Sequence, residues 1–199
     1  MSIRSTVIAG FDTSFTSTKS IAAIVILEYP SFKVLYQNYL VYEQSMEYKA
    51  GFLGQKECPK YFSLLNSSPI KPDIIFVDGF GLLHPEKYGS ATRLGTTVEI
   101  PTIGVAKNLM ETVVSVSRDD LKSSQENMVY LPSSSTNEIL GVAWRNPPKF
   151  SKYIYISIGW GLLLEECIDW TRKCCIHRIP EPIRLADLYS RSIAREIEA

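Results

Sequence analysis

The chain has 199 residues, of which 45% are hydrophobic and 21% are charged, and its 21 Lys and Arg residues balance its 21 Asp and Glu residues. These values are ordinary for one globular domain with a full core, so we predict a single domain spanning residues 1–199. Nucleic-acid binding proteins usually carry an excess of basic residues, and the overall composition of this chain shows no such excess. No segment resembles a signal peptide or approaches the length of a membrane span, so we expect a cytoplasmic protein that binds no membrane. We also expect a monomer.

The four cysteines are Cys58, Cys167, Cys174 and Cys175. They form no CxxC pair and have no spacing with His84 or His177 that would suit a structural zinc site. We therefore expect reduced, mostly buried thiols.

The first part of the chain predicts a strand over Thr6–Phe11 that runs into Asp12, followed by strands over Ile21–Leu27 and Lys33–Val41. Alternating polarity around a Pro-containing turn is typical of an antiparallel meander. A short helix follows, and we expect Pro59 in its first turn because proline is tolerated there.

The middle of the chain reads as alternating strands and helices. The apolar run 72–79 ends in Asp78-Gly79 and predicts a buried parallel strand whose end meets solvent. A glycine-containing loop leads to a helix over Ser90–Glu99. A second buried strand is expected over Pro101–Ala106, with Lys107 just past its end.

The last part begins with Ser115–Asn137, which is rich in polar residues and predicts an exposed, partly disordered insertion. A hairpin (Ile139–Trp144 and Tyr153–Ile158), a helix (Leu162–Cys175) and a final helix opened by Glu181-Pro182 are expected after it. On the final helix one face holds four residues at spacings of 4, 3 and 4: Ile183, Asp187, Ser190 and Ala194.

This order predicts an α/β fold of the ribonuclease H-like type: a central mixed five-stranded-type sheet with antiparallel first three strands and helices on both faces. Such a fold assigns no function by itself. Its geometry, however, would bring Asp12, Glu57, Asp78 and Asp187 together at one end of the sheet. Taken singly, each acid is more often a cap or turn residue.

Clustered carboxylates are stable only when they are protonated or hold hard cations, and oxygen ligands favour Mg²⁺, with Mn²⁺ as the alternative, over Zn²⁺. Two such ions, roughly 3.5 to 4 Å apart in sites of this kind, activate water and stabilise the leaving oxygen of a phosphodiester. The carboxylates therefore predict nuclease chemistry.

Five blocks of the chain resemble the endonuclease V family, in the family's order and over nearly the whole length. They are AGFDTSF, YKAGFLGQKECP, FVDGFGLLHPEKYG, LGTTVEIPTIGVAKN and RIPEPIRLAD. The resemblance implies that Asp12, Glu57, Asp78 and Asp187 are the acidic metal-site positions and that Lys107 is the active-site lysine, which would neutralise the scissile phosphate. It also implies that Tyr48 is a wedge that fills the gap left by a turned-out nucleotide. Without the motif, Lys107 is read as a solvated strand-end charge, and Tyr48 as a surface or packing residue.

The resemblance further implies a base pocket in which backbone groups read hypoxanthine, lined by Gly51, Leu53, Gly79, Gly81 and Gly89. The alternative for the glycines is ordinary turn geometry. His84 would help to hold substrate or metal-bound water, or is a loop residue hydrogen-bonded to backbone.

The chain departs from the family pattern at a few positions. Ala50 replaces a proline, Gln55-Lys56-Glu57 replaces Phe-Arg-Glu, Phe80 stands where a histidine or other polar residue is frequent, and Trp160 stands where histidine is frequent. These changes spare the five implied catalytic positions and bear on loop rigidity and substrate preference.

The resemblance implies an enzyme that recognises inosine in DNA and cuts the second phosphodiester on its 3′ side, leaving a 3′-hydroxyl and a 5′-phosphate. The partner would be inosine-containing DNA, with inosine-containing RNA as the alternative. The competing hypotheses are a ribonuclease H-like nuclease of other specificity, a non-catalytic nucleic-acid binding module and a scaffolding domain.

Overall fold

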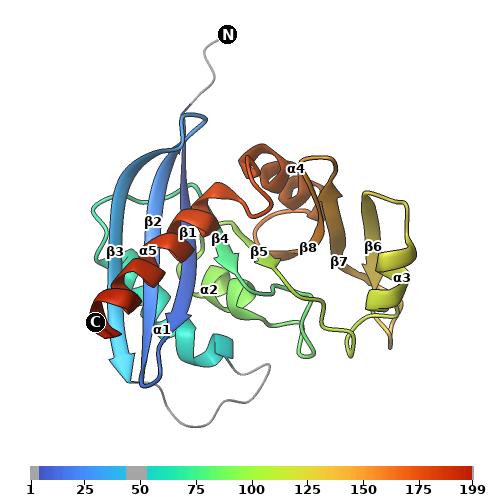
Figure 1. The fold of residues 1–199 in the computed structure, drawn as a ribbon, viewed down its shortest axis with the longest axis horizontal. Coiled ribbons are helices and arrows are strands. Elements are labelled where there is room, and N and C mark those ends of the chain that lie inside the picture. The colour runs from blue at the N-terminus through green and yellow to red at the C-terminus, as the bar shows by residue number, and fades with distance from the viewer. Residues whose placement is uncertain (1–4, 44–52, 199) are drawn as a thin grey trace.

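The computed structural model describes residues 5–43 and 53–198, apart from the side chains of residues 53–56. Its centre is a single eight-stranded sheet with the order β3-β2-β1-β4-β5-β8-β7-β6 (Figure 1). The strands are β1 (Thr6–Phe15), β2 (Lys19–Tyr29), β3 (Lys33–Glu43), β4 (Ile74–Asp78), β5 (Thr102–Ala106), β6 (Met128–Pro132), β7 (Ile139–Asn146) and β8 (Phe150–Trp160).

The helices lie on both faces of the sheet (Figure 1). They are α1 (Leu53–Asn66), α2 (Ser90–Val98), α3 (Arg118–Ser123), α4 (Leu164–Cys174) and α5 (Glu181–Glu198). Core side chains of α1 and α2, such as Tyr61 and Leu94, share one apolar cluster, whereas those of α4 and α5, such as Ile168 and Ile183, share the other. Each face of the sheet is therefore buried beneath its own pair of helices.

Strand directions confirm the predicted fold class. The first three strands are antiparallel, and β4 and β5 run parallel to β1. This is the arrangement expected of a ribonuclease H-like domain. Parallel strands end at the same edge of a sheet, so β4 and β5 deliver Asp78 and Lys107 to neighbouring positions.

Three expectations were wrong. The segment 115–137 contains α3 and β6, where an exposed and partly disordered insertion was expected. The sheet has eight strands where a five-stranded type was expected, because β8, β7 and β6 extend it beyond β5. Leu121 and Leu131 are buried, which gives this polar segment enough apolar contact to order it. Helix α1 begins at Leu53, so Pro59 is inside the helix and not in its first turn.

The cysteines have the form that the sequence predicts. All four cysteines are buried free thiols. Among the described residues, no helix is long and apolar enough to cross a membrane.

Candidate active site

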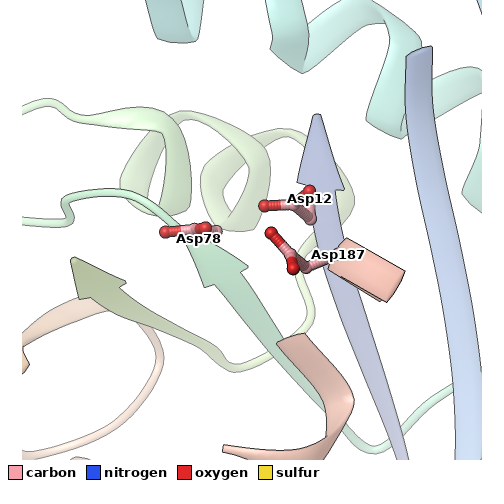
Figure 2. Close-up of side chains that lie close together, drawn as sticks. All are labelled: Asp12, Asp78 and Asp187. Atoms are coloured by element: carbon pink, nitrogen blue, oxygen red, sulfur yellow. The ribbon is translucent and has the colours of Figure 1, made fainter. Parts of the chain in front are cut away.

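Three aspartates meet at one end of the sheet. Asp12 comes from β1, Asp78 ends β4, and Asp187 comes from α5, which crosses β1 (Figure 2). Each contributes a carboxylate oxygen to a group whose members all lie within 4.8 Å of one another. Three of the four predicted acids are thus brought together by elements that are far apart in the sequence.

Helix α5 can approach β1 closely because residue 10 is glycine. A Cβ atom added there would lie 2.0 Å from the carbonyl oxygen of Pro182, near the start of the helix. Glycine is therefore required for this packing. The close contact sets the helix so that Asp187, about one and a half turns further on, reaches Asp12.

Lys107 supplies the positive charge at the centre of the aspartates. Its Nζ lies 2.5 Å from Asp78 Oδ2, 3.3 Å from Asp187 Oδ1 and 4.0 Å from Asp12 Oδ1. Burial by itself lowers the pKa of Lys107, but the three carboxylates, Asp78 foremost, outweigh burial and raise it. The ammonium group shows that this point in the molecule favours a cation.

Asp12 is the most buried of the three aspartates, with 4% of its surface exposed. Burial, followed by the neighbouring Asp78, raises the pKa of Asp12 to about 8. The hydroxyl of Ser190 donates a hydrogen bond to Asp12 Oδ2 at 3.0 Å, and the Ser190 and Ser14 hydroxyls are 2.7 Å apart. These contacts fix the orientation of the Asp12 carboxylate.

Glu57 approaches from the opposite face of the sheet, on α1. It is buried, and burial followed by the charge of Asp78 raises its pKa to about 7, although a hydrogen bond from Thr13 opposes the increase. Its carboxylate does not belong to the group within 4.8 Å that the described residues form. The structure therefore places Glu57 close enough to feel the charge of Asp78, but outside the group of three aspartates.

The loop between β4 and α2 is held by hydrogen bonds from its backbone N–H groups, two of them to β8 and one within the loop. The N–H of Gly81 donates to Ser157 Oγ at 2.9 Å, the N–H of Leu82 to the carbonyl of Ile158 at 2.8 Å, and the N–H of Gly89 to the carbonyl of Gly81 at 3.1 Å. A Cβ at Gly81 would lie 1.9 Å from the Ile158 carbonyl oxygen. Close packing is thus reason enough for glycine at this position.

The structure describes some of the other predicted substrate-binding residues and not others. Gly79 follows Asp78 and adopts a φ of +152°. His84 is buried, and its Nδ1 accepts a hydrogen bond from the backbone N–H of Glu86 at 3.3 Å, in agreement with the loop interpretation. Tyr48 and Gly51 lie outside the described residues, and of Leu53 only the backbone, at the start of α1, is described.

Several residues at the site were given no role from the sequence. Ser190 and Arg191 lie three and four positions after Asp187, and Arg191 contacts Asp187 Oδ1 at 3.0 Å. Helical spacing from Asp187 was the signal that could have identified both. A cleft of 440 Å³ continues from the aspartates along α5, past Arg191 and Arg195.

The fold and the site together define a ribonuclease H-like protein with a carboxylate centre suited to a metal ion. A family model described as Endonuclease V matches residues 2–188, and the chain belongs to this family of nuclease hydrolases. It is 34% identical to mouse Endonuclease V over 207 residues, covering 94% of this chain and 60% of the mouse protein. It is 31% identical to human Endonuclease V over 203 residues, covering 95% of this chain and 72% of the human protein.

Solved structures agree with the sequence comparison. The crystal structure of Ciona intestinalis Endonuclease V in complex with a 23-mer DNA containing an inosine followed by a ribo-adenosine has a TM-score of 0.89 and 30% identity, covering 98% of this chain and 87% of that one. The chain therefore spans less than two thirds of the length of the mouse protein, and more than two thirds of the length of the human and Ciona proteins.

Proposed function

We propose that this protein is a Mg²⁺-dependent endonuclease that recognises inosine in a nucleic-acid strand and hydrolyses the second phosphodiester bond on its 3′ side. The observation that carries the proposal is the convergence of Asp12, Asp78 and Asp187 around Lys107. Family membership and the inosine-containing DNA bound by the Ciona protein support the choice of substrate.

The donor set fits a hard divalent cation. Asp12, Asp78 and Asp187 offer only oxygen, which Mg²⁺ and Mn²⁺ prefer, and Mg²⁺ holds its ligands at about 2.0–2.1 Å, so small side-chain movements would bring these oxygens onto one ion. A bound ion would activate water and stabilise charge on the leaving oxygen. Glu57 would complete the set from the opposite face, because a nearby cation favours its charged form.

The chain's own residues have three tasks. Lys107, between the three aspartates, would neutralise the negative charge of the phosphate that is cut. Ser190 holds Asp12 in one orientation. Arg191 and Arg195, which line the cleft along α5, would face the backbone of the bound strand.

Base recognition is assigned to the loop between β4 and α2 together with residues 48–53. The hydrogen bonds at Gly81 and Gly89 support a loop shaped before substrate binds, so its backbone groups can read the edge of a turned-out base. Gly79 would line the same pocket, Tyr48 would fill the gap in the stack, and Gly51 and Leu53 would close the pocket.

We infer DNA as the substrate, and one observation favours RNA as a second candidate. The strand bound by the Ciona protein carries a ribo-adenosine directly after the inosine. Matched DNA and RNA strands, each with one inosine, distinguish the two when they are assayed side by side with Mg²⁺ and the products are mapped to the nucleotide.

In that assay, cleavage of the DNA strand at the second bond 3′ to inosine supports the first candidate, and cleavage of RNA alone supports the second. Equal cleavage of strands with adenosine in place of inosine would instead indicate a ribonuclease H-like nuclease of other specificity. No cleavage of any strand would leave a binding module or a scaffold, and would contradict the proposal.

A further inference from the structure

Arg178 joins two parts of the chain at the edge of the active site. It lies in the segment between α4 and α5. One of its terminal guanidinium nitrogens donates to the backbone carbonyl of Tyr153 at 2.6 Å and to that of Lys107 at 3.3 Å. Tyr153 belongs to β8, and Lys107 directly follows β5. The side chain therefore connects both strands from a third segment.

These contacts occur where the two strands separate. The pairing of β5 with β8 ends at Ala106, opposite Tyr155. Lys107 is the next residue, so no strand pairing fixes the direction in which its backbone leaves the sheet. The guanidinium group of Arg178 binds a carbonyl on each strand just past this point, and it does so with a charged donor, which makes stronger hydrogen bonds than a neutral one.

The segment that carries Arg178 is itself anchored to the start of α5. Within α5, the buried carboxylate of Glu181 accepts hydrogen bonds from Arg184 Nε at 2.8 Å and from one terminal nitrogen of the same guanidinium at 2.7 Å. His177 Nδ1 lies 2.6 Å from the same carboxylate. Because α5 also carries Asp187, Arg178 links the helix of one active-site acid to the strand end of the active-site lysine.

We propose that Arg178 is a positioning residue, which fixes the backbone of Lys107 and so directs its ammonium group to the three aspartates. The inference rests on the proposed function for its effect on catalysis, but not for the anchoring itself. Lysine would replace it only in part, because its ammonium group is a compact and more strongly hydrated charge than the guanidinium.

The chain offers a matched control in Arg145 on β7. It is also partly buried, one of its terminal nitrogens donates to a backbone carbonyl, that of Ser124, at 2.9 Å, and its Nε, like that of Arg178, is buried with no hydrogen-bond partner. Its guanidinium lies 4.7 Å from the ring centre of Tyr153. Arg145 therefore resembles Arg178 in setting but does not contact Lys107.

The first measurement is amide hydrogen exchange of Arg178→Gln and Arg145→Gln in the full chain. We expect exchange in the peptide that contains Lys107 and Asn108 to be about tenfold faster in Arg178→Gln than in wild type, and unchanged in Arg145→Gln. This step needs no substrate, so it tests the anchoring even if inosine strands are not cut. Unchanged exchange in Arg178→Gln would overturn the inference, as would equal acceleration in both variants.

The second measurement is single-turnover cleavage of an inosine strand, which wild type must cut for the proposed function to hold. We expect Arg178→Gln to lower the rate between about 10-fold and 100-fold at saturating enzyme, and Arg178→Lys to recover part of the loss. In the Lys107→Met background the same change should cost less than about twofold, because its effect passes through the lysine. An equal loss in both backgrounds would overturn the inference. Arg178→Lys keeps the test available if Arg178→Gln does not fold.

Discussion

At the level of single residues, Asp12 shows why a charged carboxylate at this site is unfavourable in the metal-free protein. It is 4% exposed, and burial together with Asp78 raises its pKa to about 8. Lys107 offsets the repulsion only in part, since Asp12 is the most distant of its three carboxylates. Without a metal ion the protonated form of Asp12 is therefore favoured more than in an ordinary aspartate, and a bound cation would favour the charged form.

Replacement of Asp12 by Asn separates activity from stability. We expect Asp12→Asn to abolish cleavage and to stabilise the metal-free protein by about 1–3 kcal/mol at pH 8, because the penalty of burying the charge disappears. Thermal unfolding with and without Mg²⁺ provides the check: Mg²⁺ should raise the melting temperature of wild type and leave that of the variant unchanged. An equal response to Mg²⁺ in both proteins would remove Asp12 from the metal site.

Lys107 is predicted to act on the phosphate rather than on folding. Lys107→Met should lower kcat about 100-fold or more while the variant still responds to Mg²⁺, since all the acidic ligands remain. Lys173, which pairs with Asp169 on α4 at 2.6 Å, is a suitable control, and Lys173→Met should cut at the wild-type rate. Comparable losses in the two variants would show that Lys107 has no special role.

At the scale of elements, the parts of the site that the sequence predicted are those set by local patterns. Asp78 and Lys107 follow continuous apolar runs, which define buried parallel strands and their ends. Asp187 was placed by the spacing of one helix face. How closely α5 lies against β1 could not be predicted from local patterns, because that distance depends on a contact between Gly10 and Pro182, which are far apart in the chain.

Gly10→Ala tests this helix contact. The added methyl group would lie 2.0 Å from the Pro182 carbonyl oxygen, so α5 has to move and carry Asp187 away from Asp12. We expect a loss of both stability and cleavage, the stability loss being about 2 kcal/mol or more.

Gly161→Ala is the control for Gly10→Ala. Its φ of +71° makes alanine strained, but the nearest atom of another residue is 3.6 Å from the new Cβ, so stability should fall without a matching loss of cleavage. Cleavage that falls equally in both variants would contradict the assigned role of Gly10.

At the scale of the whole molecule, the sheet extends further than the sequence indicated. The polar composition of Ser115–Asn137 predicted an exposed insertion, but β6 pairs with β7, and Leu121 and Leu131 pack in a cluster with Ala106 and Leu109. Few apolar residues were needed, because the rest of that core comes from β5, β7, β8 and the loops that carry Leu83 and residues 109–114. Composition over a window cannot detect a core whose other half lies elsewhere in the chain.

The whole metal-free protein should become less stable as pH rises. Asp12 and Glu57 have folded-state pKa values of about 8 and about 7, well above their values in an unfolded chain, so the folded state binds protons that the unfolded state has released. The loss of stability that these two groups cause is absent below about pH 4, grows between about pH 4 and pH 8, and reaches its full size above that range. Urea unfolding from pH 5 to pH 8 measures this loss, and Asp12→Asn should make the free energy of unfolding depend less on pH. A wild-type stability that rises across this range would contradict the assigned environments.

We propose that three converging aspartates use a divalent cation to cut a strand that contains inosine. A Mg²⁺ titration of strand cleavage by wild type and Asp78→Asn, on strands that differ only in inosine against adenosine, tests this proposal. We expect cleavage by wild type that requires Mg²⁺ and inosine, at the second bond on the 3′ side, and none by Asp78→Asn. Cleavage without a divalent ion, without inosine, or by Asp78→Asn at the wild-type rate would contradict it.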